Sequence, residues 1–246
     1  MERYCTQISW KDVPHLTQEQ KERLLAAIPP HQRDARTKGL PILGAGQIYP
    51  LAEELIVVDP FAIPAFWPKA YGLDVGWNVT AAIFGAWDRD SDVVYLYSEY
   101  YAGQQPPAMH SSAILARGQW IYGAIDPASA GSNQKDGTKL IDEYRNLMLN
   151  LVPADNAVEA GIHACYQRMA AGQLKVFSTC RNWISEFRIY RRDTNGKVVK
   201  ERDHLMDATR YLIMTGMNHA HIEPNELENM ERDLSSRYER SQVTGY

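Results

Sequence analysis

Residues 71–80 have the sequence Tyr–Gly–Leu–Asp–Val–Gly–Trp–Asn–Val–Thr, and residues 81–86 continue it with Ala–Ala–Ile–Phe–Gly–Ala. These two apolar runs predict a strand, a tight turn and an antiparallel return strand. One acid, Asp74, stands inside the first run, where burial of an unpaired carboxylate is costly. Gly72 and Gly76 bracket it and let backbone or ligand approach closely. Asp74 is therefore either a strand-end residue that caps a turn or part of a functional site.

Composition narrows the class of protein. The chain has 246 residues, of which 45% are hydrophobic and 23% charged, as in a soluble globular protein with one large domain or one domain and an appendage. No apolar run approaches the roughly 18 residues of a membrane span, and the N-terminus lacks the apolar core of a signal peptide. The three scattered cysteines fit a reducing compartment. The net charge of −4 gives no general attraction for nucleic acid, so contact with phosphate should be local or mediated by metal.

We divide the chain into three regions. Residues 1–60 form an appendage, in which Thr17 and Gln20 make the capping-box pattern of a helix and residues 55–58 form a short strand. Residues 61–221 form the main domain, and residues 222–246 form a polar, charged tail.

In the main domain, a hairpin followed by alternating helices and strands predicts an α/β fold with a mixed sheet and helices on its faces. The nearly all-apolar strand at 120–125 should be buried on both faces and parallel to a neighbour. Asp155 should cap the helix that follows it. Beyond the first hairpin, we expect strands at 93–101, 120–125 and 174–178, and helices at 106–117, 139–151, 155–171, 181–190 and 203–215.

Four acids fall where this sheet would bring them together. Asp74 lies in the first strand, Asp126 follows the strand at 120–125, and Asp203 and Asp207 share one face of the last helix. In an open sheet, ligands collect at the carboxyl ends of the strands. Clustered carboxylates repel each other, and Mg²⁺ or Mn²⁺, which prefer oxygen ligands, relieve that repulsion. Because two such ions can clamp the attacking and leaving oxygens of a phosphodiester, the pattern predicts metal-dependent phosphodiester hydrolysis.

Each acid also has a simpler structural interpretation. Asp126 stands before a proline and would serve to start a turn. Asp203 would serve as the N-cap of the last helix, and Asp207 would pair with Arg210 one turn later. His204 is the one histidine that we single out, because it adjoins the acidic helix face and could orient a carboxylate or touch a phosphate.

Together these motifs resemble the nuclease domain of the large terminase subunit of tailed bacteriophages. The resemblance covers nearly the whole chain, and residues 9–16 and 35–49 look like the segment that joins the family's packaging ATPase to its nuclease. The segments that carry it are Asp74 in Gly–Leu–Asp–Val–Gly–Trp, Asp126 in Ala–Ile–Asp–Pro–Ala–Ser, Asp203–His–Leu–Met–Asp207, and Gly172–Gln–Leu–Lys–Val–Phe.

The resemblance implies a ribonuclease-H-like fold and an endonuclease that cuts concatemeric phage DNA during packaging in the host cytoplasm. It implies that Asp74, Asp126 and Asp207 bind two Mg²⁺ or Mn²⁺ ions, with Asp203 as a fourth carboxylate nearby. Which of the two helix acids is the better ligand stays open. It implies double-stranded DNA, the portal protein and the small terminase subunit as partners. The family's ATPase carries a phosphate loop, and no G-x-x-x-x-G-K-[ST] occurs here, so the resemblance is to the nuclease portion alone.

Contacts with DNA would come from cations in the second half of the chain. The segment 188–200 could lie along a phosphate backbone or be an ordinary solvated hairpin. Because nothing supplies a base-reading helix, we expect little sequence specificity. The candidate cations are Lys135, Lys139, Lys175, Arg181, Arg188, Arg191, Arg192, Lys197, Lys200 and Arg202.

Three other functions compete with this one. A Holliday-junction resolvase of the same fold would also use an early strand acid and late helical acids. A sugar-kinase or actin-like ATPase would use residues 74–80 as its Asp-x-Gly-x-x-Thr hairpin, but the required second hairpin and adenosine loop are missing from the sequence. A docking module of the packaging machine would need no catalysis at all.

Overall fold

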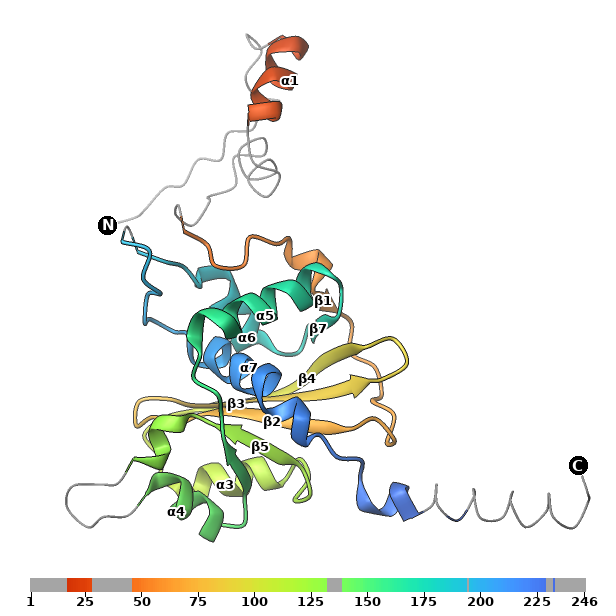
Figure 1. Cartoon of the computed structure of the whole chain (residues 1–246), viewed down its shortest axis with the longest axis vertical. Helices are drawn as coiled ribbons and strands as arrows, with labels where there is room; N and C mark the ends of the chain where they lie inside the picture. Colours follow the sequence, from red (N-terminus) through yellow and green to blue (C-terminus); the bar gives the residue numbers. More distant parts are fainter. Residues whose placement is uncertain (1–16, 28–45, 132–138, 194, 229–231, 233–246) are drawn as a thin grey trace, which may run out of the picture.

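The computed structural model describes residues 17–27, 46–131, 139–193, 195–228 and 232 (Figure 1). Predictions that concern residues 1–16 and 28–45, Lys135, and most of the tail fall outside these residues. None of the described helices is long and apolar enough to cross a bilayer. The helices are α1 Gln18–Ala27, α3 Pro107–Leu115, α4 Leu140–Asn146, α5 Val158–Ala170, α6 Arg181–Ile189 and α7 His204–Met214, with short 3₁₀ turns at Glu53–Leu55, Pro127–Ala130 and Gly216–His219. The strands are β1 Val57–Val58, β2 Lys69–Asp74, β3 Thr80–Asp88, β4 Val93–Ala102, β5 Tyr122–Ile125, β6 Asn150–Pro153 and β7 Leu174–Phe177.

The strands form one mixed sheet in the order β1-β7-β4-β3-β2-β5-β6. β2, β3 and β4 form an antiparallel meander, and the other neighbours pair in parallel. β2, β4, β5 and β7 therefore run in the same direction. Their carboxyl ends meet at one edge of the sheet, where ligands of open α/β sheets usually bind.

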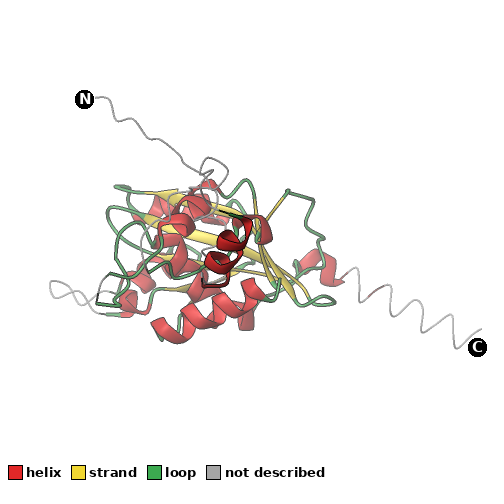
Figure 2. Ribbon diagram, turned by 90° about the horizontal axis from the view of Figure 1, so that it is seen from above, coloured by secondary structure: helices red, strands yellow, loops and turns green. Residues whose placement is uncertain are grey.

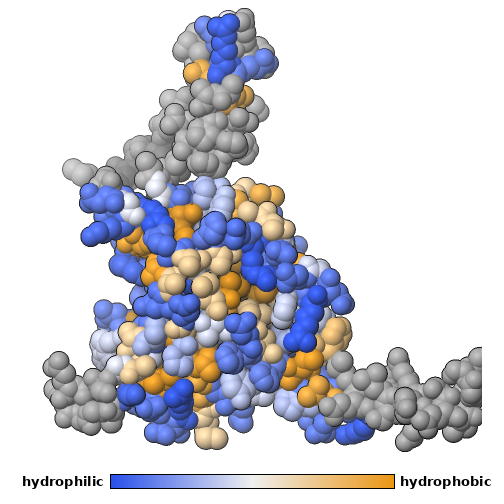
Figure 3. Space-filling view, viewed as in Figure 1, coloured by the Kyte–Doolittle hydropathy of each residue, from blue (hydrophilic) through white to orange (hydrophobic). Residues whose placement is uncertain are grey.

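Helices cover both faces of the sheet, as the sequence predicts (Figures 1 and 2). Alternation along β3 assigns the faces: Ala81 and Ile83 pack in the core with α5, α6 and α7, whereas Ala82 and Phe84 pack with α3 and α4. On β2, Ala70 lies on the α7 side of the sheet. Asp74, an even number of residues along, points to the same side. The surface seen in Figure 3 mixes hydrophilic and hydrophobic patches, as in an ordinary globular domain.

Gly72 sets the distance between β2 and α7. A Cβ atom built at this position would lie 1.8 Å from the carbonyl oxygen of Ala208 and 2.9 Å from the backbone nitrogen of Leu212. Only glycine allows the helix backbone to come this close to the strand. The close approach predicted for this glycine is thus between two backbones, and it brings α7 against the strand that carries Asp74.

The predicted helix at 139–151 is wrong in its second half. α4 ends at Asn146, and residues 150–153 form β6, which pairs in parallel with β5. Met148 has a φ of 71°, in the left-handed region, and breaks the helix. Pairing with β5 and burial of Leu149 and Leu151 against the core outweigh the local helical pattern.

Two other details differ from or extend the predictions. The N-cap of α5 is Ala157, and Asp155 instead accepts the N–H of Ala157 in a turn before the helix. In the segment that we assigned to the appendage, β1 pairs with β7, and Tyr49 and Ile56 are buried in the core. These residues thus contribute to the sheet domain, while the division of the chain at residues 60 and 221 stays a prediction.

The predicted capping box of α1 is confirmed. Gln20 N–H donates to Thr17 Oγ1 at 3.3 Å, and Thr17 N–H donates to Gln20 Oε1 at 3.0 Å.

Candidate active site

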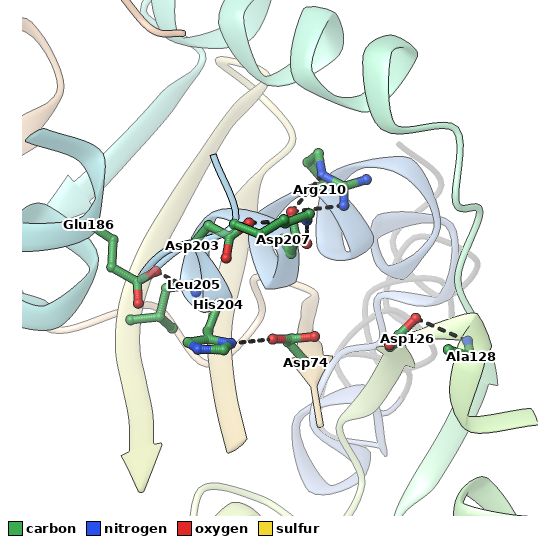
Figure 4. Close-up of polar contacts among 10 residues, drawn as sticks. Asp74, Asp126, Ala128, Glu186, Asp203, His204, Leu205, Asp207 and Arg210 are labelled. Atoms are coloured by element: carbon green, nitrogen blue, oxygen red, sulfur yellow. Dashed lines mark hydrogen bonds and ion pairs between the residues drawn. The ribbon is translucent and has the colours of Figure 1, made fainter. Parts of the chain in front are cut away.

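Asp74 and Asp126 lie next to each other at the carboxyl edge of the sheet (Figure 4). Parallel pairing sets Leu73 beside Ile125, and the N–H of Asp126 donates to the carbonyl of Leu73 at 3.0 Å. The predicted turn role of Asp126 is also present, because its Oδ1 accepts the N–H of Ala128 at 3.0 Å.

Asp203 and Asp207 approach the same edge from α7, and the positive charges of neighbouring side chains hold them. Asp207 accepts from Lys200 Nζ at 2.7 Å and from Arg210 Nη2 at 2.8 Å. Asp203 pairs with Lys200 Nζ at 3.0 Å. Burial alone would lower the pKa of Lys200, but these two carboxylates raise it above its ordinary value. Asp203 is the N-cap of α7 by position, but its side chain accepts no hydrogen bond from the helix.

His204 orients Asp74, which is one of the two roles that the sequence suggests for it. Its Nδ1 lies 2.9 Å from Asp74 Oδ2, and this hydrogen bond raises the pKa of His204 against the opposing effect of burial. Burial raises the pKa of Asp74. The hydrogen bond from His204 lowers that pKa, and the charges of Asp207 and Asp126 raise it again.

The charges of Asp126 and Asp207 therefore both act on Asp74. All three acids also lie close enough to Tyr211 on α7 to affect it. Burial, and then the charges of these acids, raise the pKa of its hydroxyl. In Figure 4 their carboxyl groups surround one region between β2, β5 and α7. The structure brings together the acids that the sequence singles out.

In this structure the acids bind other protein groups and do not form a ready-made metal site. Among the described residues, no three Asp, Glu, His or Cys side chains form a group that could already hold a metal ion. Asp207 is engaged by Lys200 and Arg210, and Asp126 by the N–H of Ala128. A cation bound here would compete with the Lys200 ammonium group for Asp203 and Asp207.

Glu186 is a supporting residue that the sequence analysis did not single out. It is buried, and its Oε2 accepts the N–H of Leu205 at 2.6 Å. A carboxylate at this position satisfies a free N–H group of the first turn of α7 and complements the helix dipole. The signal in the sequence is an acid on the apolar face of α6, next to Trp183 and Phe187.

Most cations proposed as DNA contacts are paired within the protein instead. Arg188 donates two hydrogen bonds of 2.7 Å to Glu53, and Arg192 donates two to Glu159. Lys175 donates to the carbonyl of Leu55. The hairpin interpretation of 188–200 is supported by a bridge between residues 192 and 198.

Comparisons with known proteins agree with this geometry. The family model of the terminase RNaseH-like domain matches residues 71–215. The chain is 37% identical over 213 residues to the terminase large subunit of Salmonella phage P22. This alignment covers 81% of the chain and 42% of that protein. The large subunit of Enterobacteria phage LP7 is also 37% identical over 213 residues, with 81% of the chain and 44% of that protein covered. The chain thus spans less than half the length of these relatives.

Solved structures show the same fold. The P22 large terminase nuclease domain superposes with a TM-score of 0.67 and 32% identity over 73% of this chain and 96% of that one. The nuclease of the large terminase of phage G20c, solved with bound magnesium, has a TM-score of 0.52 and 14% identity over 70% of this chain and 98% of that one, a likeness of fold alone. The predicted ribonuclease-H-like fold and the resemblance to terminase nuclease domains are confirmed.

Proposed function

Because the chain belongs to the terminase RNaseH-like domain family, we propose that it is a metal-dependent endonuclease that cuts concatemeric double-stranded phage DNA during genome packaging. The observation that supports this most directly is the approach of Asp74, Asp126 and Asp207 from three elements to one edge of the sheet. We place this activity in the host cytoplasm. The portal protein and the small terminase subunit are the partners that the family resemblance suggests.

We assign Asp74, Asp126 and Asp207 as ligands of Mg²⁺ or Mn²⁺, with Asp203 as a nearby fourth carboxylate. Carboxylate oxygens are the donors that these ions prefer. The two helix acids already attract a cation, the ammonium group of Lys200. Mutual repulsion contributes to the raised pKa of Asp74, and a divalent cation would relieve it.

Two such ions, when bound, stabilise the attacking and leaving oxygens of a phosphodiester. The chain's own side chains prepare the carboxylates for this role. His204 fixes the orientation of Asp74, and Arg210 fixes Asp207 through two N–H groups. Carboxylates held in this way lose little freedom when a phosphate arrives, and such positioning is a large part of catalysis.

A plasmid-cutting assay tests the proposal. The protein should nick plasmid DNA with Mg²⁺ or Mn²⁺ and little sequence preference, and EDTA should stop it. Asp74→Ala should abolish cutting and leave the urea unfolding midpoint near that of the parent protein. Asp90→Ala is the matched control, because Asp90 is an exposed acid in the β3–β4 turn at the opposite edge of the sheet. Cutting that survives both Asp74→Ala and EDTA would refute the mechanism.

A further inference from the structure

The loop between β2 and β3 presents an exposed tryptophan beside the candidate active site. Trp77 as a whole residue is 72% exposed, whereas the side chain of Asp74, three residues earlier, is only 15% exposed. A tryptophan carries a large apolar surface, and its exposure forgoes the stabilisation that burial would give. Single exposed apolar residues are common, so the surroundings of Trp77 decide whether it has a role.

Contacts with neighbouring segments hold the backbone of the loop at Trp77. Val75 and Val79 pack against the cores on opposite faces of the sheet, so that only residues 76–78 are left facing outward. The carbonyl of Trp77 accepts the N–H of Gln104 at 2.8 Å, which ties the loop to the segment after β4. The hydroxyl of Thr80 donates to the carbonyl of Gly76 at 3.1 Å.

The contact between the two loops is as close as backbones allow. A Cβ atom at Gly103 would lie 1.8 Å from the carbonyl oxygen of Asn78. The backbone that carries the indole is therefore held by contacts between two loops, and binding a ligand would cost little further loss of backbone freedom.

Apart from Pro106, the exposed side chains of these loops are aromatic or amide groups. They are Trp77, Asn78, Gln104 and Gln105. Lysine and arginine bind phosphate, but aromatic rings stack on bases, and amide groups form hydrogen bonds with base edges. This rim thus suits the bases of a nucleic acid better than its backbone.

The position of Trp77 along a bound duplex follows from chain geometry. Three residues span at most about 11 Å, so the Cα atom of Trp77 lies within that distance of the Cα atom of Asp74. Because DNA rises about 3.4 Å per base along one strand, this limit on the Cα–Cα distance corresponds to roughly three base steps.

We propose that Trp77 is a DNA-contacting residue that stacks on a base beside the phosphate to be cut. The inference rests on the proposed function, because it takes DNA as the substrate at Asp74. Apolar side chains such as Phe and Leu insert between base steps in other DNA-binding proteins and unstack them locally. Trp77 would then hold the strand in place, and the acids would carry out the chemistry.

DNA binding by variants tests this role without any cutting. Fluorescence anisotropy with a labelled 20-base-pair duplex, in Ca²⁺ instead of Mg²⁺, should show that Trp77→Ala binds about 5- to 150-fold more weakly, the range found for loss of one base–aromatic stack. Trp77→Phe keeps an aromatic face and should recover most of the affinity. The DNA-induced change in tryptophan fluorescence should shrink in Trp77→Phe relative to the parent protein.

Phe66→Ala is the matched control. Phe66 is also an exposed aromatic residue, but it precedes β2 and so lies at the opposite end of that strand from Asp74. Its loss should leave DNA affinity unchanged, and both variants should keep the parent unfolding midpoint. A Trp77→Ala dissociation constant within twofold of the parent value, or an equal loss in Phe66→Ala, would overturn the inference. If Asp74→Ala still abolishes cutting in that case, the proposed function stands without it, whereas a parent protein that never cuts DNA would refute the function itself.

Discussion

Gly72→Ala should separate the two halves of the candidate active site. The added Cβ atom would start 1.8 Å from the carbonyl oxygen of Ala208, and real Cβ contacts are essentially never shorter than 3.0 Å. The helix or the strand must therefore move by at least 1.2 Å, the difference between these two distances. The obstacle is the backbone of α7, which cannot rotate away as a side chain can.

This displacement would act on the proposed chemistry through Asp207. The clash is with the residue next to Asp207 in α7, so the shift carries its carboxylate away from Asp74 on β2. Misplacement of a catalytic group by about 1 Å can cost about 100-fold in rate. Overpacking of a core typically lowers the free energy of unfolding by about 1–3 kcal/mol. We expect Gly72→Ala to cut plasmid DNA about 100-fold more slowly while it remains folded at 25 °C.

The measurement is the initial rate of plasmid nicking at saturating Mg²⁺, together with urea unfolding of the same samples. Gly85→Ala is the matched control, because Gly85 is also a glycine of a central strand beneath α7. A Cβ atom there would meet Leu212 Cδ2 at 2.8 Å and Val94 Cγ1 at 3.2 Å, which are ends of side chains that can shift. It should lose stability but keep most of its activity. Equal rates for Gly72→Ala and the parent protein would show that the β2–α7 distance does not set the geometry of the site.

Two further variants probe the charges around α7. Lys200→Gln removes the ammonium group between Asp203 and Asp207, and because Lys200 is 59% exposed we expect a stability loss below about 1 kcal/mol. Mg²⁺ should then raise the melting temperature of this variant at lower concentration than for the parent, and identical Mg²⁺ titrations would contradict the expectation. Burial raises the pKa of Glu186, so the folded protein keeps a proton that the unfolded chain releases above its ordinary pKa of about 4.3. The free energy of unfolding should therefore fall as pH rises from that value to the folded pKa, and Glu186→Gln should flatten this part of the profile in urea titrations; an unchanged slope would show that another group is responsible.

The sequence predicts the fold well where local pattern and tertiary pairing agree. The hairpin of residues 71–86 is confirmed, because two apolar runs around a short turn leave few alternatives. The strand at 120–125 pairs in parallel on both sides, as its continuous apolar character predicts. The prediction fails at residues 147–151, where the pattern is helical but the outer side of β5 is free to pair with another strand. The choice between helix and strand here depends on the position of β5, which lies earlier in the sequence.

For the site, the sequence predicts the acids better than it predicts their partners. The ion pair of Asp207 with Arg210 follows from helical spacing, and the structure confirms it. Lys200 lies before the helix begins, and its contact with Asp207 depends on how the chain enters α7, which no periodicity encodes. The sequence predicts this lysine as a candidate DNA contact, whereas in the structure it forms ion pairs with Asp203 and Asp207.

The geometry of the acids therefore depends on residues outside the acidic motifs. Gly72 sets how close α7 lies to β2, and Glu186 satisfies the first turn of that helix. Neither carries out chemistry in the mechanism we propose, yet each positions the element that bears Asp203 and Asp207. A chain that kept all four acids but lost Gly72 would still match the acidic pattern of a nuclease. Its strand and helix would be held further apart, and the misplaced acids would cut DNA more slowly under the proposed mechanism, so the acids alone do not establish full activity.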